Sequence, residues 1–343
     1  MQSMLTKVPL LRAWHFARRR MACSALSGHP VVYHPDMQIQ PVAEGHRFPM
    51  PKDHLLYLAL REEGLAGSTF TPAYPDRDTL LLAHTPDYVD SFLEGRLSAS
   101  AMRSIGLPWS PALVQRTLVG TGSAVLAARL ALQYGVACMC NGGTHHAHPS
   151  HGSGWCVFND QAVAARAAQR DAGVGKVLFV DLDVHQGDGT AAIFQDDPSV
   201  FTFSLHCSNQ GFPARLQASD LDVGLPAGTG DAEYMAVLQE VLPGLLANQR
   251  PDLVMYNAGV DVHRDDSLGK FKLSLEGIRN RDQYVLASCA DAGVPVACAI
   301  GGGYEPDHSH IVRRHLCLHQ AAAQLLPNFL RGRALKRQRF GVH

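Results

Sequence analysis

Residues 176–189 read Lys176-Val-Leu-Phe-Val-Asp-Leu-Asp-Val-His-Gln-Gly-Asp-Gly189. A short apolar run, Lys176–Val180, leads here directly into three acidic side chains and a histidine. A run of this length without a polar face is typical of a strand that is buried on both faces of a parallel sheet. Polar side chains that follow such a strand lie at the carboxyl edge of the sheet, where α/β proteins bind ligands. The stretch therefore predicts an α/β fold with a functional site at that edge.

Outside this stretch, apolar runs alternate with helix-length segments, which predicts a three-layer α/β/α fold with a mainly parallel central sheet. The other predicted strands are Val31–Tyr33, Thr79–Leu82, Val136–Cys140, Val200–Leu205, Leu253–Tyr256 and Pro295–Ile300. The predicted helices are Pro86–Leu93, Pro111–Gln133, Asp160–Ala172, Ala232–Asn248, Leu275–Ala292 and His308–Leu326. No repeat or low-complexity linker divides residues 31–326, so we expect one domain there.

Composition narrows the class of protein. Of the 343 residues, 46% are hydrophobic and 18% are charged, which is enough apolar mass for a large core. The formal net charge is −1, so no global field attracts nucleic acid, and we expect no direct nucleic-acid binding. The best membrane-span candidate, Thr117–Ala128, is bounded by Arg116 and Arg129 and is too short, so we expect no membrane partner.

The cysteine pattern indicates a reducing, cytoplasm-like compartment, because the eight cysteines include no CxxC pair. Cys138 and Cys140 are close enough in sequence to suggest a metal site. They alternate within an apolar run, however, and we favour the simpler interpretation of a buried strand.

Both ends of the chain are basic. Residues 1–30 contain Lys7, Arg12 and three consecutive arginines, 18–20, without an acidic residue. Such an N-terminal extension can be a transit peptide for a mitochondrion or plastid, a disordered extension or the product of a misplaced start codon. Residues 327–343 form a basic C-terminal tail, which we expect to be solvated.

Metal-ligand chemistry is indicated by Asp181-x-Asp183-x-His185. The alternation of an extended chain turns these three side chains to one side, where carboxylate and imidazole can meet on one cation. Asp261 follows another predicted strand at the same edge and is the natural third ligand beside two of them. A set of oxygen and nitrogen donors that leaves one coordination position open suits Zn²⁺, and Fe²⁺ and Mn²⁺ are competitors for it. The alternatives are that these acids cap helices or hold a structural ion.

Acid–base chemistry is indicated by His145 and His146, which follow a Gly-Gly turn after another strand. An imidazole can act as general base for a water, and Asp181 and Asp188 can each orient one of the two rings. Tyr304 follows Gly301-Gly-Gly303 and could donate its hydroxyl to an oxyanion. Taken alone, the histidines are also compatible with ordinary core or surface polarity, and the tyrosine with a loop anchor.

Together these residues make the chain resemble the zinc-dependent histone deacetylase family, whose fold is shared with arginase. The matching motifs span about residues 31–326, and its catalytic domain is expected there. They are Gly142-Gly-Thr-His-His-Ala147, Gly154-Trp-Cys-Val-Phe-Asn-Asp160, Val180–Gly189, Phe203-Ser-Leu-His206, Asn257-Ala-Gly-Val-Asp261 and Gly301-Gly-Gly-Tyr304. The segments Tyr256–Asp261, Asp266-Ser-Leu-Gly269 and Arg281-Asp282 look most like the class IV branch and its bacterial relatives.

The resemblance implies roles by position. Asp183, His185 and Asp261 would hold zinc, His146 would be the general base, and Tyr304 would polarise the scissile carbonyl. His145 would be an electrostatic partner or proton donor, with Asp181 paired to it and Asp188 paired to His146. It also implies a potassium ion held by Asp181, Asp183, His185, Ser204 and Leu205, and an acyl-lysine tunnel lined by Gly154, Trp155, Phe212 and Gly302.

The implied activity is removal of acetyl or longer acyl groups from the lysine ε-amine in proteins. Trp155 stands where class I members usually have Phe, and Asp188 where the class IV branch often has Asn, so acyl length and branch are open. The main alternative is a deacetylase of acetylpolyamines or other small amides. A two-manganese ureohydrolase and a non-catalytic binding protein are further alternatives, and the sequence leaves the oligomeric state open.

Overall fold

The computed structural model describes residues 26–340, with side chains from residue 26 to residue 332. Within this range the strands form one sheet in the order β2-β1-β3-β8-β7-β4-β5-β6, and every pairing is parallel. The predicted parallel α/β sheet is confirmed. The strands are β1 Pro30–Val32, β2 Ser68–Phe70, β3 Val136–Met139, β4 Val177–Asp181, β5 Val200–Cys207, β6 Leu221–Leu225, β7 Leu253–Gly259 and β8 Val296–Gly301.

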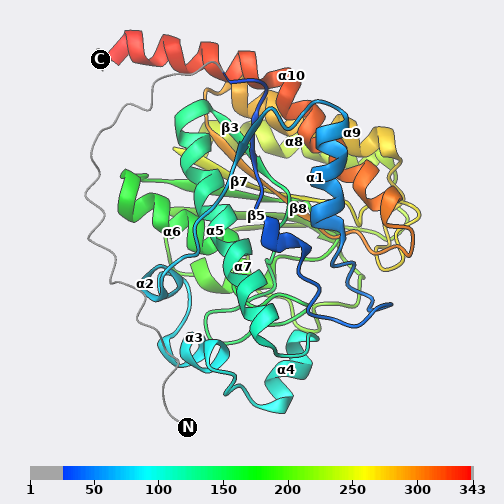
Figure 1. Cartoon of the computed structure of the whole chain (residues 1–343). Coiled ribbons are helices and arrows are strands. Elements are labelled where there is room, and N and C mark those ends of the chain that lie inside the picture. The colour runs from blue at the N-terminus through cyan, green and yellow to red at the C-terminus, as the bar shows by residue number, and fades with distance from the viewer. Residues whose placement is uncertain (1–25, 341–343) are drawn as a thin grey trace.

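Helices cover both faces of the sheet, which gives the three layers (Figure 1). They are η1 Pro35–Gln38, α1 Lys52–Glu62, α2 Arg77–Leu80, α3 Pro86–Leu93, α4 Ala99–Ile105, α5 Pro111–Tyr134, α6 Asp160–Ala172, α7 Asp188–Phe194, α8 Asp231–Gln249, α9 Leu275–Asp291 and α10 His308–Phe340. Helices α5 and α6 pack on one face, and α1, α8, α9 and α10 on the other. Among residues 26–340, no helix combines the length and apolar character that crossing a bilayer requires.

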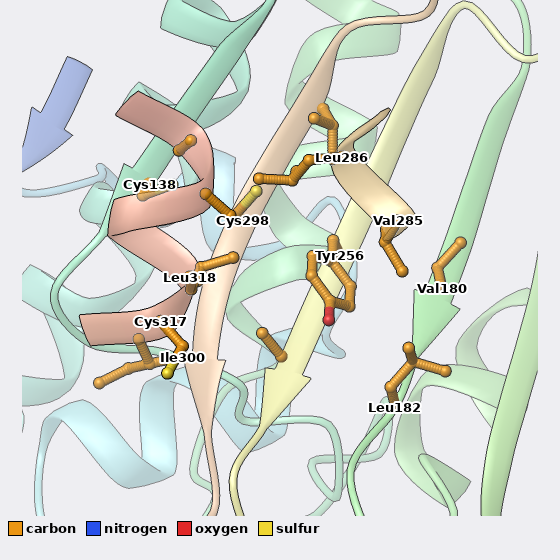
Figure 2. Close-up of a cluster of buried hydrophobic side chains, with 14 of the residues drawn as sticks. Cys138, Val180, Leu182, Tyr256, Val285, Leu286, Cys298, Ile300, Cys317 and Leu318 are labelled. Atoms are coloured by element: carbon orange, nitrogen blue, oxygen red, sulfur yellow. The ribbon is translucent and has the colours of Figure 1, made fainter. Parts of the chain in front are cut away.

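Alternation along each strand builds the two cores. In β3, Val136 and Cys138 join the cluster under α10, whereas Ala137 and Met139 join the cluster under α5 and α6. Figure 2 shows part of the first cluster, with Cys138 and Cys298 on neighbouring strands beneath α10. The central strands are buried on both faces, which is why they lack a polar side.

Capping side chains set several helix boundaries. Ser110 accepts a hydrogen bond from the Leu113 amide at 3.1 Å at the start of α5, and Asn159 does the same for the Ala162 amide at 3.0 Å at the start of α6. Gly173 ends α6 in the left-handed conformation that glycine adopts without strain.

Other predictions of strands and helices were wrong or incomplete. Thr79–Leu82 is not a strand: Asp76 caps helix α2 by accepting a hydrogen bond from the Thr79 amide at 2.8 Å, and a turn follows. The strands β2 and β6 and the helices α1, α4 and α7 were not predicted. Both of these strands are edge strands and lack fully buried residues, so they carry no strong apolar signal. Helix α10 runs to residue 340, past the predicted end at 326, with Pro327 inside it. The proposed transit peptide lies almost wholly outside the described residues.

Candidate active site

Three predicted metal ligands meet at the carboxyl edge of the sheet. Asp183 and His185 follow β4, and Asp261 follows β7, the strand beside it. His185 Nδ1 lies 2.9 Å from Asp183 Oδ1 and 3.2 Å from Asp261 Oδ2. One donor atom from each residue falls within 4.8 Å of the others, and all three side chains are buried. This is a geometry that can hold a metal ion.

The local chemistry fits a divalent cation. Asp261 Oδ2 is buried and receives no hydrogen bond from the described part of the chain, while Oδ1 accepts one from the Val184 amide at 3.1 Å. Burial lowers the pKa of His185, but Asp183 and Asp261 outweigh it and raise that pKa to about 10. Asp183 and Asp261 therefore stabilise positive charge at the His185 ring nitrogen to which a metal ion would bind.

A glycine makes room for this cluster. Gly302 has φ +58°, and a Cβ at this position would lie 2.3 Å from the Asp261 carboxyl carbon. Any side chain there would both strain the backbone and displace the carboxylate. This explains in physical terms why the loop before Tyr304 needs glycine.

Two histidine–aspartate pairs stand beside the cluster, as the sequence predicts. His145 Nδ1 lies 2.7 Å from Asp181 Oδ2, and His146 Nδ1 lies 2.6 Å from Asp188 Oδ1. The two rings are adjacent, with their centroids 4.0 Å apart. When Nδ1–H donates to a carboxylate, the lone pair of the neutral ring is at Nε2, so each aspartate sets the tautomer of its partner.

The two imidazoles differ in proton affinity. Burial lowers the pKa of His145, but Asp181 and Asp183 raise it overall to about 9. Burial and the neighbouring His145 lower the pKa of His146 to about 4. Environments that give two adjacent groups such different pKa values are typical of a general acid and a general base. Of the two rings, His145 binds a second proton more readily, and His146 stays neutral more readily.

Tyr304 closes the other side of the site. Its ring centroid lies 6.5 Å from that of His185 and 5.2 Å from that of Trp155. Burial and the nearby carboxylates of Asp261 and Asp183 raise its pKa well above the usual value, so the hydroxyl keeps its proton and can donate it in a hydrogen bond.

The four predicted tunnel residues gather around these groups. Phe212 packs edge-on against His146, with centroids 4.8 Å apart, and a Cβ on Gly154 would lie 2.7 Å from the Phe212 ring. Trp155 has a positive φ of 64° and donates its amide to Ile105 O at 2.7 Å, which ties this loop to α4. An uncommon backbone conformation thus aims the indole at Tyr304. Gly302, beside Asp261, completes the set.

The five residues predicted for a monovalent cation also lie together. Asp181 on β4 pairs in register with Ser204 on β5, and Leu205 follows it. Ser204 Oγ lies 3.0 Å from His206 Nδ1. Asp183 and His185 continue from β4, so the five residues lie at the carboxyl ends of the adjacent strands β4 and β5, and two of them also belong to the metal-ligand cluster.

Comparison with known proteins identifies the family. The family model described as "Histone deacetylase domain" matches residues 46–319. This chain belongs to the histone deacetylase family. A solved structure, the HDA15 HD domain, aligns with a TM-score of 0.70 and 22% identity over 91% of this chain and 97% of that one, which supports the arginase/deacetylase fold.

Three relatives illustrate the range of the histone deacetylase family around this chain. An uncharacterised protein of Picosynechococcus is 52% identical over 86% of this chain and 98% of its own length. Histone deacetylase 2 of Arabidopsis thaliana is 30% identical over 70% of this chain and 64% of its own length. The human protein named Polyamine deacetylase HDAC10 is 31% identical over 70% of this chain, which spans 39% of that protein.

Sequence reasoning missed several residues of the deacetylase site. Lys52, at the start of α1, donates Nζ to Gly302 O at 2.5 Å and lies 5.7 Å from the Tyr304 ring centroid. Asn257 donates Nδ2 to Asp181 Oδ1 at 2.9 Å. Asp266 accepts the amides of Leu268, Gly269 and Tyr304. Asn257 and Asp266 lie in quoted motifs and could have been found there, whereas no local signal marks Lys52.

Proposed function

We propose that this protein is a zinc-dependent amidohydrolase that removes acetyl or longer acyl groups from the ε-amine of lysine in proteins or peptides. The observation that carries the proposal is the meeting of three components at one sheet edge. They are the Asp183–His185–Asp261 cluster, the two histidine–aspartate pairs and the Tyr304 hydroxyl with its glycine loop. Amide hydrolysis needs each of them: charge stabilisation, proton transfer and an oxyanion donor.

The protein residues divide the proton transfers between them. His146, neutral and held by Asp188, takes a proton at Nε2 from the attacking water. Tyr304 donates its hydroxyl to the carbonyl oxygen as negative charge develops there. His145, which Asp181 and Asp183 keep protonated, supplies positive charge beside this step and a proton for the leaving amine.

Asp183, His185 and Asp261 would hold the zinc ion, with Fe²⁺ as a competitor for the same donors. A divalent cation bound there would supply Lewis-acid polarisation of the carbonyl and a lowered pKa for a bound water. We also propose K⁺ behind it, at the stretch formed by Asp181, Asp183, His185, Ser204 and Leu205. Its role there would be structural.

A deacetylase of acetylated polyamines or other small amines is the second candidate, because a relative carries the name Polyamine deacetylase. The surface beside Tyr304 favours neither substrate by charge. A surface cavity of about 890 Å³ beside Tyr304 is lined by both acidic and basic side chains, among them Glu44, Arg47 and Glu305. The chemistry at the metal cluster is the same for both substrate classes.

Hydrolysis of a matched substrate set tests the proposal. Acyl-lysine peptides from acetyl to long-chain and acetylated polyamines are compared with the zinc-loaded protein, with His146→Ala as the inactive control. Preferential cleavage of acyl-lysine, lost in His146→Ala, supports the lysine deacylase. Preference for polyamines assigns the second candidate, and no hydrolysis of either set contradicts both. Addition of a chelator should abolish the activity, and Zn²⁺ should restore it.

The remaining assignments are also proposals. We place the protein in the cytoplasm, with a mitochondrion or plastid as the alternative should residues 1–30 act as a transit peptide. The class IV branch is the proposed position within the family. No nucleic-acid or membrane partner is proposed.

A further inference from the structure

A second group of metal-ligand side chains lies away from the catalytic edge. His29 immediately precedes β1, Cys138 lies within β3, and His319 lies within α10. All three side chains are fully buried on the α10 face of the sheet. Figure 2 shows the position of Cys138 beneath α10, next to Cys298 on β8. None of these residues takes part in the proposed hydrolysis.

The donor atoms of this group converge. His29 Nε2 lies 3.0 Å from His319 Nδ1, and one donor atom each from His29, Cys138 and His319 falls within 4.8 Å of the others. Tetrahedral zinc with nitrogen and sulfur ligands places its donors about 3.3–3.7 Å apart, from bond lengths of about 2.0 and 2.3 Å. Small side-chain adjustments therefore convert the observed arrangement into a coordination sphere.

Hydrogen bonding alone does not account for the cluster. His29 Nδ1 and His319 Nε2 are buried and have no partner in the part of the chain that is described. A buried polar atom without a partner destabilises the folded state. Within the same range, neither ring has a carboxylate as a hydrogen-bond partner, unlike His145 and His146 at the catalytic edge.

Sulfur determines which ions the group would prefer. Cys138 Sγ lies near the ring nitrogens of His29 and His319, and Cys298 faces Cys138 across the β3–β8 pairing. A thiolate with two imidazoles is a soft donor set that selects Zn²⁺ or Cu⁺ over Mg²⁺, Ca²⁺ or Mn²⁺. The catalytic cluster of two carboxylates and one imidazole has no sulfur donor.

We propose that His29, Cys138 and His319 bind a thiophilic cation, Zn²⁺ or Cu⁺, as a structural centre separate from the catalytic cluster. Cys298 faces Cys138 across the β3–β8 pairing and is not needed as a ligand. Because the ligands are fully buried, the ion enters as the chain folds and exchanges slowly afterwards. It ties the segment before β1 to α10, which lies 290 residues later in the chain.

Metal counting in a chain without the catalytic cluster tests this centre. The variant His185→Ala/Asp261→Ala, with Cys23→Ser to remove the cysteine outside the described residues, is produced in medium supplied with Zn²⁺ or copper and purified without chelator. We expect one tightly held equivalent of one of the two metals. Adding Cys138→Ala or His319→Gln should reduce it to near zero, while Cys317→Ala, a buried cysteine on the same helix as His319, should leave it unchanged.

Cobalt substitution gives a second readout that does not require a disabled catalytic site. Full-length protein carrying only Cys23→Ser, folded with Co²⁺, should show a thiolate-to-cobalt charge-transfer band, because only the proposed centre contributes sulfur. The band should disappear in Cys138→Ala and persist in Cys317→Ala. Absence of both a retained metal and this band would overturn the proposal, as would a metal content or band that survives Cys138→Ala and His319→Gln.

Discussion

The Tyr304 amide donates a hydrogen bond to Asp266 Oδ2 at 2.7 Å, while Asp266 Oδ1 accepts the amides of Leu268 and Gly269 at 2.9 Å. One buried carboxylate thus joins the loop that follows Asp261 to the loop that carries Tyr304. All three of these hydrogen bonds go to backbone amides and none to a proposed metal ligand. It is a positioning residue for Tyr304.

Asp266→Asn should lower kcat by about 10²-fold, because a displacement of about 1 Å in a catalytic group can have an effect of this size. The amide of asparagine replaces one acceptor oxygen with an N–H₂ group, so at least one of the three backbone hydrogen bonds is lost. We expect KM to change much less than kcat in steady-state deacetylation assays. Asp265→Asn, at the neighbouring exposed position, is the matched control and should behave as wild type. Equal losses in both variants would contradict the positioning role.

Tyr304→Phe should reduce turnover by about 10²- to 10³-fold, the usual effect of removing one oxyanion donor. The change deletes only the hydroxyl and keeps the ring that packs near Trp155, so the thermal unfolding midpoint should be almost unaffected. Tyr284→Phe, on α9 and away from the site, controls for loss of a tyrosine hydroxyl. Near-normal turnover in Tyr304→Phe would rule out this role for the hydroxyl.

Local patterns predict much of this site because its ligands follow strands directly. Asp183 and His185 alternate after an unmistakable buried strand, and adjacent parallel strands then bring Asp261 to the same edge. Pairings such as His146 with Asp188 came from the family resemblance, and the structure places the two side chains in contact.

Contacts between distant segments could not be predicted in this way. Lys52 reaches Gly302 across 250 residues, and His29 reaches His319 across 290. Nothing in the sequence near either residue specifies the partner, because both contacts depend on how helices pack on the sheet. The strand predicted at Thr79–Leu82 was wrong for a different reason. A short apolar run is compatible with either helix or strand, and here the capping side chain of Asp76 favours the helix.

Arg281→Ala should destabilise the protein by about 3–5 kcal/mol, the usual result of removing one partner of a buried ion pair. Arg281 is fully buried, bonds Asp282 through Nε at 3.0 Å, and donates to Leu182 O and Gly259 O. Leu182 and Gly259 each lie within two residues of a proposed metal ligand, so metal affinity should fall together with stability. Chemical denaturation and metal titration measure the two effects.

Arg279→Ala is the matched control for that change. Arg279 lies on the same helix, is partly exposed, and pairs with Glu276 at the surface. Exposed pairs of this kind contribute about 0–1 kcal/mol, so this variant should unfold almost as wild type does. Similar unfolding curves for Arg279→Ala and Arg281→Ala would show that the buried ion pair contributes no more to stability than the exposed one.

His84 should make the folded state sensitive to mild acid. Its Nδ1 lies 3.0 Å from His148 O, and its Nε2 accepts the Asn159 amide at 2.9 Å, so the buried ring must be neutral with its proton on Nδ1. Burial lowers its pKa to about 4, from 6.5 for an ordinary histidine. Between these pH values the unfolded chain binds more protons than the folded one, so stability should decline as pH falls from about 6.5 to 4, by about 3 kcal/mol for this residue.

His84→Gln isolates this contribution, because a glutamine amide can also donate to His148 O and accept from the Asn159 amide but does not titrate. The free energy of unfolding of His84→Gln should depend less on pH between 4 and 6.5 than that of the wild type. His310→Gln is the control: His310 is exposed, and hydrogen bonding to Glu305 raises its pKa, so its effect has the opposite sign. Parallel pH curves for wild type and His84→Gln, from urea unfolding at each pH, would show that His84 does not contribute to acid sensitivity.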